Sequence, residues 1–112
     1  DCIFCKIIAG EIPADVVLEN DDVLVFRDLN PVAPTHLLAI PKKHIATIND
    51  MQDEDAEISG KLFLAAKEAA KLEGIVENGY RVVMNCGKDA GQVVFHNHLH
   101  ILGGRHFSWP PG

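Results

Sequence analysis

The sequence lacks several features that define whole classes of protein. None of its apolar runs approaches the roughly 18 residues that a membrane-spanning helix needs, and no charged segment followed by an apolar stretch opens it. Three cysteines are odd in number and too few for a disulfide scaffold. Basic residues are outnumbered, with 10 Lys and Arg against 16 Asp and Glu. We therefore expect a cytoplasmic protein whose main partner is neither nucleic acid nor a membrane.

What is present suits one small domain. The chain has 112 residues, of which 47% are apolar, which allows one modest core over residues 1–112 and not two. Apolar runs at 16–18 and 23–26 flank turn residues and predict an antiparallel hairpin. A third strand is predicted at 36–40, where Pro41 follows it. Residues 2–8 fit either a short helix or a strand.

The second half of the chain predicts one long helix and two more strands. Residues 53–72 carry an apolar stripe at helical spacing, from Ile58 to Leu72, and Gly74 follows as a natural stop. Strands are predicted at 80–84 and 93–102, and residues 87–91 between them are short enough for a hairpin loop. These elements together predict an α+β fold, a five-stranded, mainly antiparallel sheet with one long helix.

The strongest chemical signal is three histidines in strict alternation. His96, His98 and His100 fall on one face if their segment is a strand. Three imidazoles are costly to bury as core, because each ring nitrogen needs a partner. A solvated face and a metal site remain alternatives. Because the outer pair would be ~13 Å apart, three of these histidines do not easily share one ion, whereas two could. The third alternative is catalysis by a neutral, nucleophilic imidazole.

The histidines belong to a longer pattern that covers nearly the whole chain. His-x-His-x-His is followed by apolar residues and by Gly103-Gly104-Arg105. Further matching segments are Ile7-Ile8, Glu11-Ile12-Pro13, Phe26-Arg27-Asp28, Ala33-Pro34-Thr35-His36, Ile40-Pro41-Lys42-Lys43-His44, Gly91-Gln92 and Ser108-Trp109-Pro110-Pro111-Gly112. In these segments the sequence resembles the histidine-triad (HIT) superfamily, and the Trp-Pro-Pro tail resembles its Hint branch of histidine triad nucleotide-binding proteins.

The resemblance implies hydrolysis of purine nucleoside phosphoramidates. His98 would attack the α-phosphorus, expel the amine and form a nucleotidyl-histidine that water hydrolyses to a nucleoside monophosphate. His100 would donate to phosphate oxygens, and His96 would complete the triad. His36 would support these residues without contacting the substrate itself. No cofactor is required for this chemistry. The resemblance also implies a homodimer, in which two sheets join and each C-terminal tail approaches the partner's site.

Nucleotide contacts are implied for a further set of residues. The set is Phe26, Asp28, Leu29, Asn85, Gly91, Gln92 and Val93, together with His98 and His100. The Asp28 carboxylate would accept hydrogen bonds from both ribose hydroxyls, and its alternative role is to cap the Asn30-Pro31 turn. Family members often carry a hydroxyl residue where this chain has Val93, so a phosphate contact there would come from backbone N–H alone. Asn97 replaces a usual apolar residue and is expected to affect packing.

Cys2 and Cys5 form a second signal, because Cys-x-x-Cys alone is half of a zinc site. In some bacterial members of the superfamily, the matching positions of His44 and His96 complete a tetrahedral Cys2His2 set. A structural zinc is therefore one interpretation, and two inert thiols or a redox pair are the alternatives. For the whole protein, the alternatives are a nucleotide-binding module with little turnover, a dinucleoside polyphosphate hydrolase of a sister branch, and a zinc protein whose histidines serve only metal.

Overall fold

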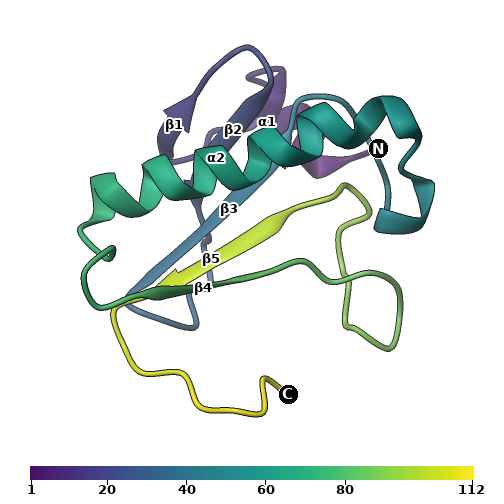
Figure 1. Cartoon of the computed structure of the whole chain (residues 1–112). Coiled ribbons are helices and arrows are strands. Elements are labelled where there is room, and N and C mark those ends of the chain that lie inside the picture. Colours follow the sequence, from purple (N-terminus) through teal and green to yellow (C-terminus); the bar gives the residue numbers. More distant parts are fainter.

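The computed structural model describes residues 1–112 and has an α+β architecture (Figure 1). The helices and strands are α1 (Ile3–Ile8), β1 (Val16–Glu19), β2 (Val23–Arg27), β3 (Thr35–Pro41), α2 (Ala56–Glu73), β4 (Tyr80–Val83) and β5 (Leu99–Gly103). Two short 3-10 turns, at Ile48–Asp50 and Asp53–Asp55, precede α2. The opening segment, for which the sequence allowed two structures, is thus helical. None of the helices combines the length and apolar character needed to cross a membrane.

The five strands form one antiparallel sheet in the order β1-β2-β3-β5-β4. The predicted α+β class, the five strands and the single long helix are confirmed. Along β3 and β5, Leu38 lies opposite His100 and His36 lies opposite Leu102. Since opposed residues project to the same face and side chains alternate along a strand, His36 and His100 share one face of the sheet.

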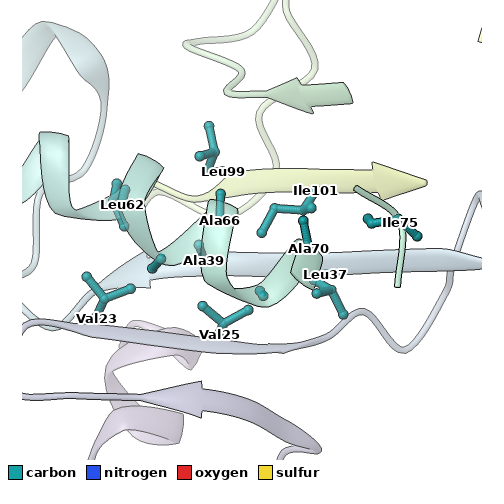
Figure 2. Close-up of a cluster of buried hydrophobic side chains, with 12 residues drawn as sticks. Val23, Val25, Leu37, Ala39, Leu62, Ala66, Ala70, Ile75, Leu99 and Ile101 are labelled. Atoms are coloured by element: carbon teal, nitrogen blue, oxygen red, sulfur yellow. The ribbon is translucent and has the colours of Figure 1, made fainter. Parts of the chain in front are cut away.

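The other face of the sheet is covered by α2 and forms the main hydrophobic core (Figure 2). Small residues on the inner side of the helix, such as Ala66 and Ala70, lie against Val25, Leu37 and Ile101 of the strands. The helix ends at Gly74, which adopts a left-handed backbone conformation with φ of 71°. This conformation is strained for residues with a side chain and is readily adopted by glycine. The helix therefore stops at the predicted glycine, although its last predicted core residue, Leu72, is exposed and Ala70 is buried instead.

The predicted fifth strand is wrong at its beginning. The sequence predicted a strand over 93–102 after a hairpin loop at 87–91, but β5 begins only at Leu99 and residues 84–98 connect it to β4. Hydrogen bonds to other segments explain the difference. The Gln92 amide donates to Ala46 O at 2.9 Å, and Asn97 N–H donates to Ile45 O at 2.7 Å, so this segment bonds the chain after β3 and not a neighbouring strand. Only His100 of the three histidines lies in a strand.

Candidate active site

A cavity of about 520 Å3 opens on the sheet face opposite α2, and we call it the pocket. It is bounded by α1, the end of β2, the loop that follows β2 and the connection before β5. Of the predicted nucleotide contacts, Phe26, Asp28, Leu29, Asn85, Gly91, Val93, His98 and His100 line it, and so does His36. Gln92 and His96 do not. The pocket therefore brings together most of the residues that the resemblance implied.

Gln92 is buried and holds the shape of the connection instead of lining the pocket. Its side-chain oxygen accepts from Gly87 N–H at 2.8 Å, and its amide nitrogen donates to the backbone carbonyls of Ala46 and Val94. Every polar atom of the side chain is thus occupied by backbone. Val93 beside it is 85% exposed at the rim of the pocket.

A hydrogen bond of His98 determines which of its ring nitrogens is unprotonated. His98 Nδ1 lies 2.8 Å from His96 O, and a carbonyl can only accept, so Nδ1 carries the proton. In the neutral ring Nε2 then holds the unshared electron pair. His98 also lines the pocket, so this unprotonated nitrogen has the chemistry that a nucleophile requires.

A chain of hydrogen bonds fixes the tautomers of His36 and His100 in the same way. Val32 N–H donates to His36 Nδ1 at 3.1 Å, so the neutral ring of His36 carries its proton on Nε2. That nitrogen lies 2.9 Å from His100 Nδ1, to which it donates. His100 must therefore carry its own proton on Nε2, as a donor available to a bound phosphate.

Burial keeps these imidazoles neutral. It lowers the pKa of His100 to about 4, and the neighbouring His98 and His36 add to the shift. Burial also lowers the pKa of His36, against the opposing effect of the Asp28 carboxylate. Because both rings are uncharged near pH 7, the donor chain described above is the state present at neutral pH.

Of the two roles considered for Asp28, the structure shows one. Its Oδ1 accepts from Asn30 N–H at 2.8 Å, which is the turn-capping role. Its Oδ2 lies 3.4 Å from His36 Nε2, and the residue lines the pocket.

The wall of the pocket formed by α1 was not predicted. Ile3, Phe4 and Ile7 line the pocket, and Phe4 contacts Phe26 edge-on with ring centroids 5.6 Å apart. Ile3 and Ile7 are one helical turn apart, a spacing that would have indicated a shared face had the segment been assigned as a helix.

Beside the pocket lies a second group of side chains, which we call the Cys/His cluster: Cys2, Cys5, His44 and His96. Cys2 caps α1, since its Sγ accepts from Cys5 N–H at 3.3 Å, so both thiols lie at the start of the helix. His96 is fully buried and its Nε2 donates to Pro41 O at 2.8 Å. This hydrogen bond leaves His96 Nδ1 unprotonated and facing the cysteines.

The separations within the Cys/His cluster fit a tetrahedral zinc ion. Zinc bonds of about 2.0 Å to nitrogen and 2.3 Å to sulfur place ligand atoms roughly 3.3–3.8 Å apart. The Sγ atoms of Cys2 and Cys5 lie 3.3 and 3.6 Å from His96 Nδ1. His44 Nδ1 lies 3.4 Å from Cys5 Sγ and 3.1 Å from His96 Nδ1. The Pro41 carbonyl orients the His96 ring, as the partners of metal-bound histidines do.

Comparison with known proteins identifies the family. The model of the HIT domain matches residues 9–107, and the chain belongs to the HIT family. A protein of Synechocystis sp. named "Uncharacterized HIT-like protein" is 54% identical over 112 residues, covering 100% of this chain and 97% of its own.

Two crystal structures extend the comparison. A HIT family hydrolase from Legionella pneumophila is 57% identical with a TM-score of 0.97, and 100% of each chain is covered. The histidine triad nucleotide-binding protein from Candida albicans is 35% identical with a TM-score of 0.84, over 98% of this chain and 83% of its own. The fold predicted from the resemblance is therefore confirmed as the HIT fold.

Proposed function

We propose that this protein hydrolyses purine nucleoside phosphoramidates through a nucleotidyl-histidine formed on His98, as a member of the Hint branch. The observation that carries the proposal is the pair of opposite tautomers, with a bare Nε2 on His98 and a protonated Nε2 on His100. A nucleophile and a donor are thus held side by side, with ring centroids 5.0 Å apart. Hydrolase function in the Legionella relative and nucleotide binding in the Candida relative agree with this chemistry.

The reaction proceeds in two displacements at phosphorus. The electron pair of His98 Nε2 attacks the α-phosphorus and forms the new bond. The phosphorus–nitrogen bond to the amine breaks, and the amine leaves with the electron pair of this broken bond and takes a proton from solvent. His100 Nε2–H donates to a phosphate oxygen, where negative charge develops. Water then attacks phosphorus and releases a proton to solvent. The bond between phosphorus and His98 Nε2 breaks, its electron pair returns to Nε2, and the nucleoside monophosphate leaves a neutral His98.

The rest of the pocket suits a purine nucleoside. Apolar side chains of Ile3, Ile7 and Phe26 line it and would contact a base. Asp28 lines it too, and its Oδ2 would accept from the ribose hydroxyls. These residues support the placing of a base and a ribose in the same pocket as the imidazoles.

We also propose that the Cys/His cluster holds a structural zinc ion. The four donor atoms have the separations and the oriented imidazole that such a site requires. The ion would tie the N-terminus to the segment before β5. It supplies no step of the reaction, which the imidazoles carry alone.

A homodimer is the third part of the proposal. β4 is an edge strand of the sheet, with backbone groups free to pair. The C-terminal tail runs clear of the sheet (Figure 1), and its Trp109 is 80% exposed. A large aromatic side chain in water favours coverage by a second copy. Sedimentation velocity of the protein tests this, with a dimer expected and a monomer at micromolar concentration against it.

Steady-state assays separate the function from its alternatives. The protein is expected to release AMP from a fluorogenic adenosine phosphoramidate much faster than it cleaves a diadenosine polyphosphate, and His98→Ala should abolish release while AMP binding survives. Preference for the diadenosine compound would support the sister branch. Intact binding without turnover would support a binding module, and Val93, which replaces the usual hydroxyl residue, would be the first position to change.

A further inference from the structure

Phe4 lies between the two cysteines of the Cys/His cluster in sequence, and between that cluster and His98 in space. We propose that Phe4 is a positioning residue that holds the ring of His98, and that it links the state of the Cys/His cluster to the rate of attack at phosphorus. The inference rests on the proposed function for its kinetic consequence, while its structural part concerns the histidine ring alone.

The contacts of Phe4 place it against the nucleophile. Its side chain is 6% exposed, and its ring meets His98 edge-on, with centroids 5.2 Å apart and planes at 85°. The same ring contacts His96 at 5.9 Å. Edge-on aromatic pairs at such separations are favourable and directional. Phe4 therefore contacts both the nucleophile and the residue whose carbonyl orients it.

His98 depends on such contacts because one hydrogen bond does not fix an imidazole ring. The bond from Nδ1 to His96 O fixes one end of the ring. The remaining freedom is rotation of the ring about its side-chain bonds, which would move Nε2. Phe4 and His100 both contact the ring and restrict this rotation. A displacement of about 1 Å at a reacting atom can lower a rate by up to about a hundredfold.

Phe4 is in turn held by the residues that flank it. α1 has only six residues, too few to be stable as an isolated helix. Its start is fixed by Cys2 and Cys5, whose sulfur atoms face His96 and His44. A zinc ion bound by the four side chains of the Cys/His cluster would therefore keep Phe4 in contact with His98, although the ion would lie outside the pocket.

The first test compares Phe4→Leu with Leu24→Val in the zinc-loaded protein. Leu24 belongs to the same apolar cluster as Phe4 but does not line the pocket, so its variant controls for lost packing. Phe4→Leu is expected to lower kcat about tenfold and to change KM less than about threefold, because the attack geometry is lost more than binding. Leu24→Val should leave both constants unchanged. Equal kinetics for the two variants would overturn the proposal.

A spectroscopic measurement tests the structural part without substrate. In the NMR spectrum of the zinc-loaded wild type, the His98 Nδ1 proton that bonds His96 O should give a sharp downfield signal. Phe4→Leu should broaden or shift this signal, and Leu24→Val should not. An unchanged signal in Phe4→Leu would overturn the proposal. If the wild type shows no turnover, the proposed function fails, but this result still decides whether Phe4 holds the ring.

The link to the Cys/His cluster is tested by removing zinc with a chelator in both backgrounds. In the wild type, removal should lower kcat about tenfold and disturb the His98 signal as Phe4→Leu does. In Phe4→Leu, removal should add little, because the link is already broken and the effects are not additive. Two results would contradict the link. One is that the decreases in kcat from Phe4→Leu and from zinc removal multiply, and the other is that the His98 signal of the wild type does not change when zinc is removed.

Discussion

The two faces of the sheet are built from different chemistry. The face under α2 packs hydrocarbon on hydrocarbon, with twelve buried apolar residues in one cluster. The opposite face joins a smaller apolar cluster to a row of imidazoles, whose ring centroids lie 4.9 Å apart at His44 and His96 and 5.2 Å apart at His36 and His100. The larger apolar core therefore lies on one face and the pocket on the other, so we expect that stability and the proposed activity can be changed separately.

The largest effect on stability is expected on the α2 face. Leu62→Ala removes a fully buried side chain and should lower the free energy of unfolding by about 2–5 kcal/mol, as large-to-small core changes do. Turnover per folded molecule should stay within about twofold, because the change is remote from the pocket. Urea denaturation measures the first effect and steady-state kinetics the second. Leu64→Ala on the exposed side of the same helix is the control.

Acid should act on the opposite face. The pKa of His100 is about 4 in the folded protein and near its ordinary 6.5 when unfolded, so the unfolded chain binds the proton first as pH falls. Unfolding free energy should therefore decrease between about pH 6.5 and 4, by on the order of 1–3 kcal/mol. The lowered pKa of His36 acts in the same direction. Denaturation curves at pH 7 and 5 test this, and equal stability at the two would contradict it.

His36→Asn tests the donor chain within that face. Asparagine does not bridge Val32 N–H and His100 Nδ1 as the imidazole does, so His100 loses the partner that fixes its proton on Nε2. We expect kcat to fall about tenfold or more, as when an orienting partner of a catalytic group is lost. Lys67→Gln, at an exposed position on α2, is the control. A loss confined to KM would show that His36 serves binding and not the tautomer.

The smallest expected change in the free energy of unfolding is at Asn97, a buried polar residue next to His96 and His98 in the sequence. It is 1% exposed, and neither atom of its side-chain amide has a hydrogen-bond partner in the protein. Asn97→Val should raise the free energy of unfolding by about 1 kcal/mol, because it removes an unsatisfied amide. The isosteric Asn97→Asp should lower it, since it buries an unpaired charge. Thermal or chemical denaturation of the pair decides, and a less stable Val variant would refute this view.

The sequence predicted the α2 face of the sheet better than the segment before β5. On the α2 face, local patterns were enough: an apolar stripe at helical spacing predicted the helix, and apolar, β-branched runs next to turn residues predicted most strands. Before β5, composition favoured a strand, but Gln92 and Asn97 bond the backbone after β3, about fifty residues away in the chain. Local patterns do not contain such contacts.

For the site, most of the residues that the resemblance named do line the pocket, and the structure added the hydrogen bonds that set their proton positions. Proton positions on His98 and His100 depend on the carbonyl of His96 and on Val32 N–H, partners that no residue type reveals. Phe4 was missed because its role depends on Cys2 meeting His96 across 94 positions of sequence. Gln92 was placed at the nucleotide, whereas its polar atoms are taken by backbone.

The central claim is that His98 Nε2 forms a bond to phosphorus, and one measurement tests it directly. The protein is mixed with an adenosine phosphoramidate, stopped within milliseconds to seconds under conditions that preserve phosphorus–nitrogen bonds, and digested for mass spectrometry. We predict a mass increment of one AMP on the peptide that contains His98, absent from His98→Ala. Turnover with no adduct, or with the adduct on another residue, would contradict the account.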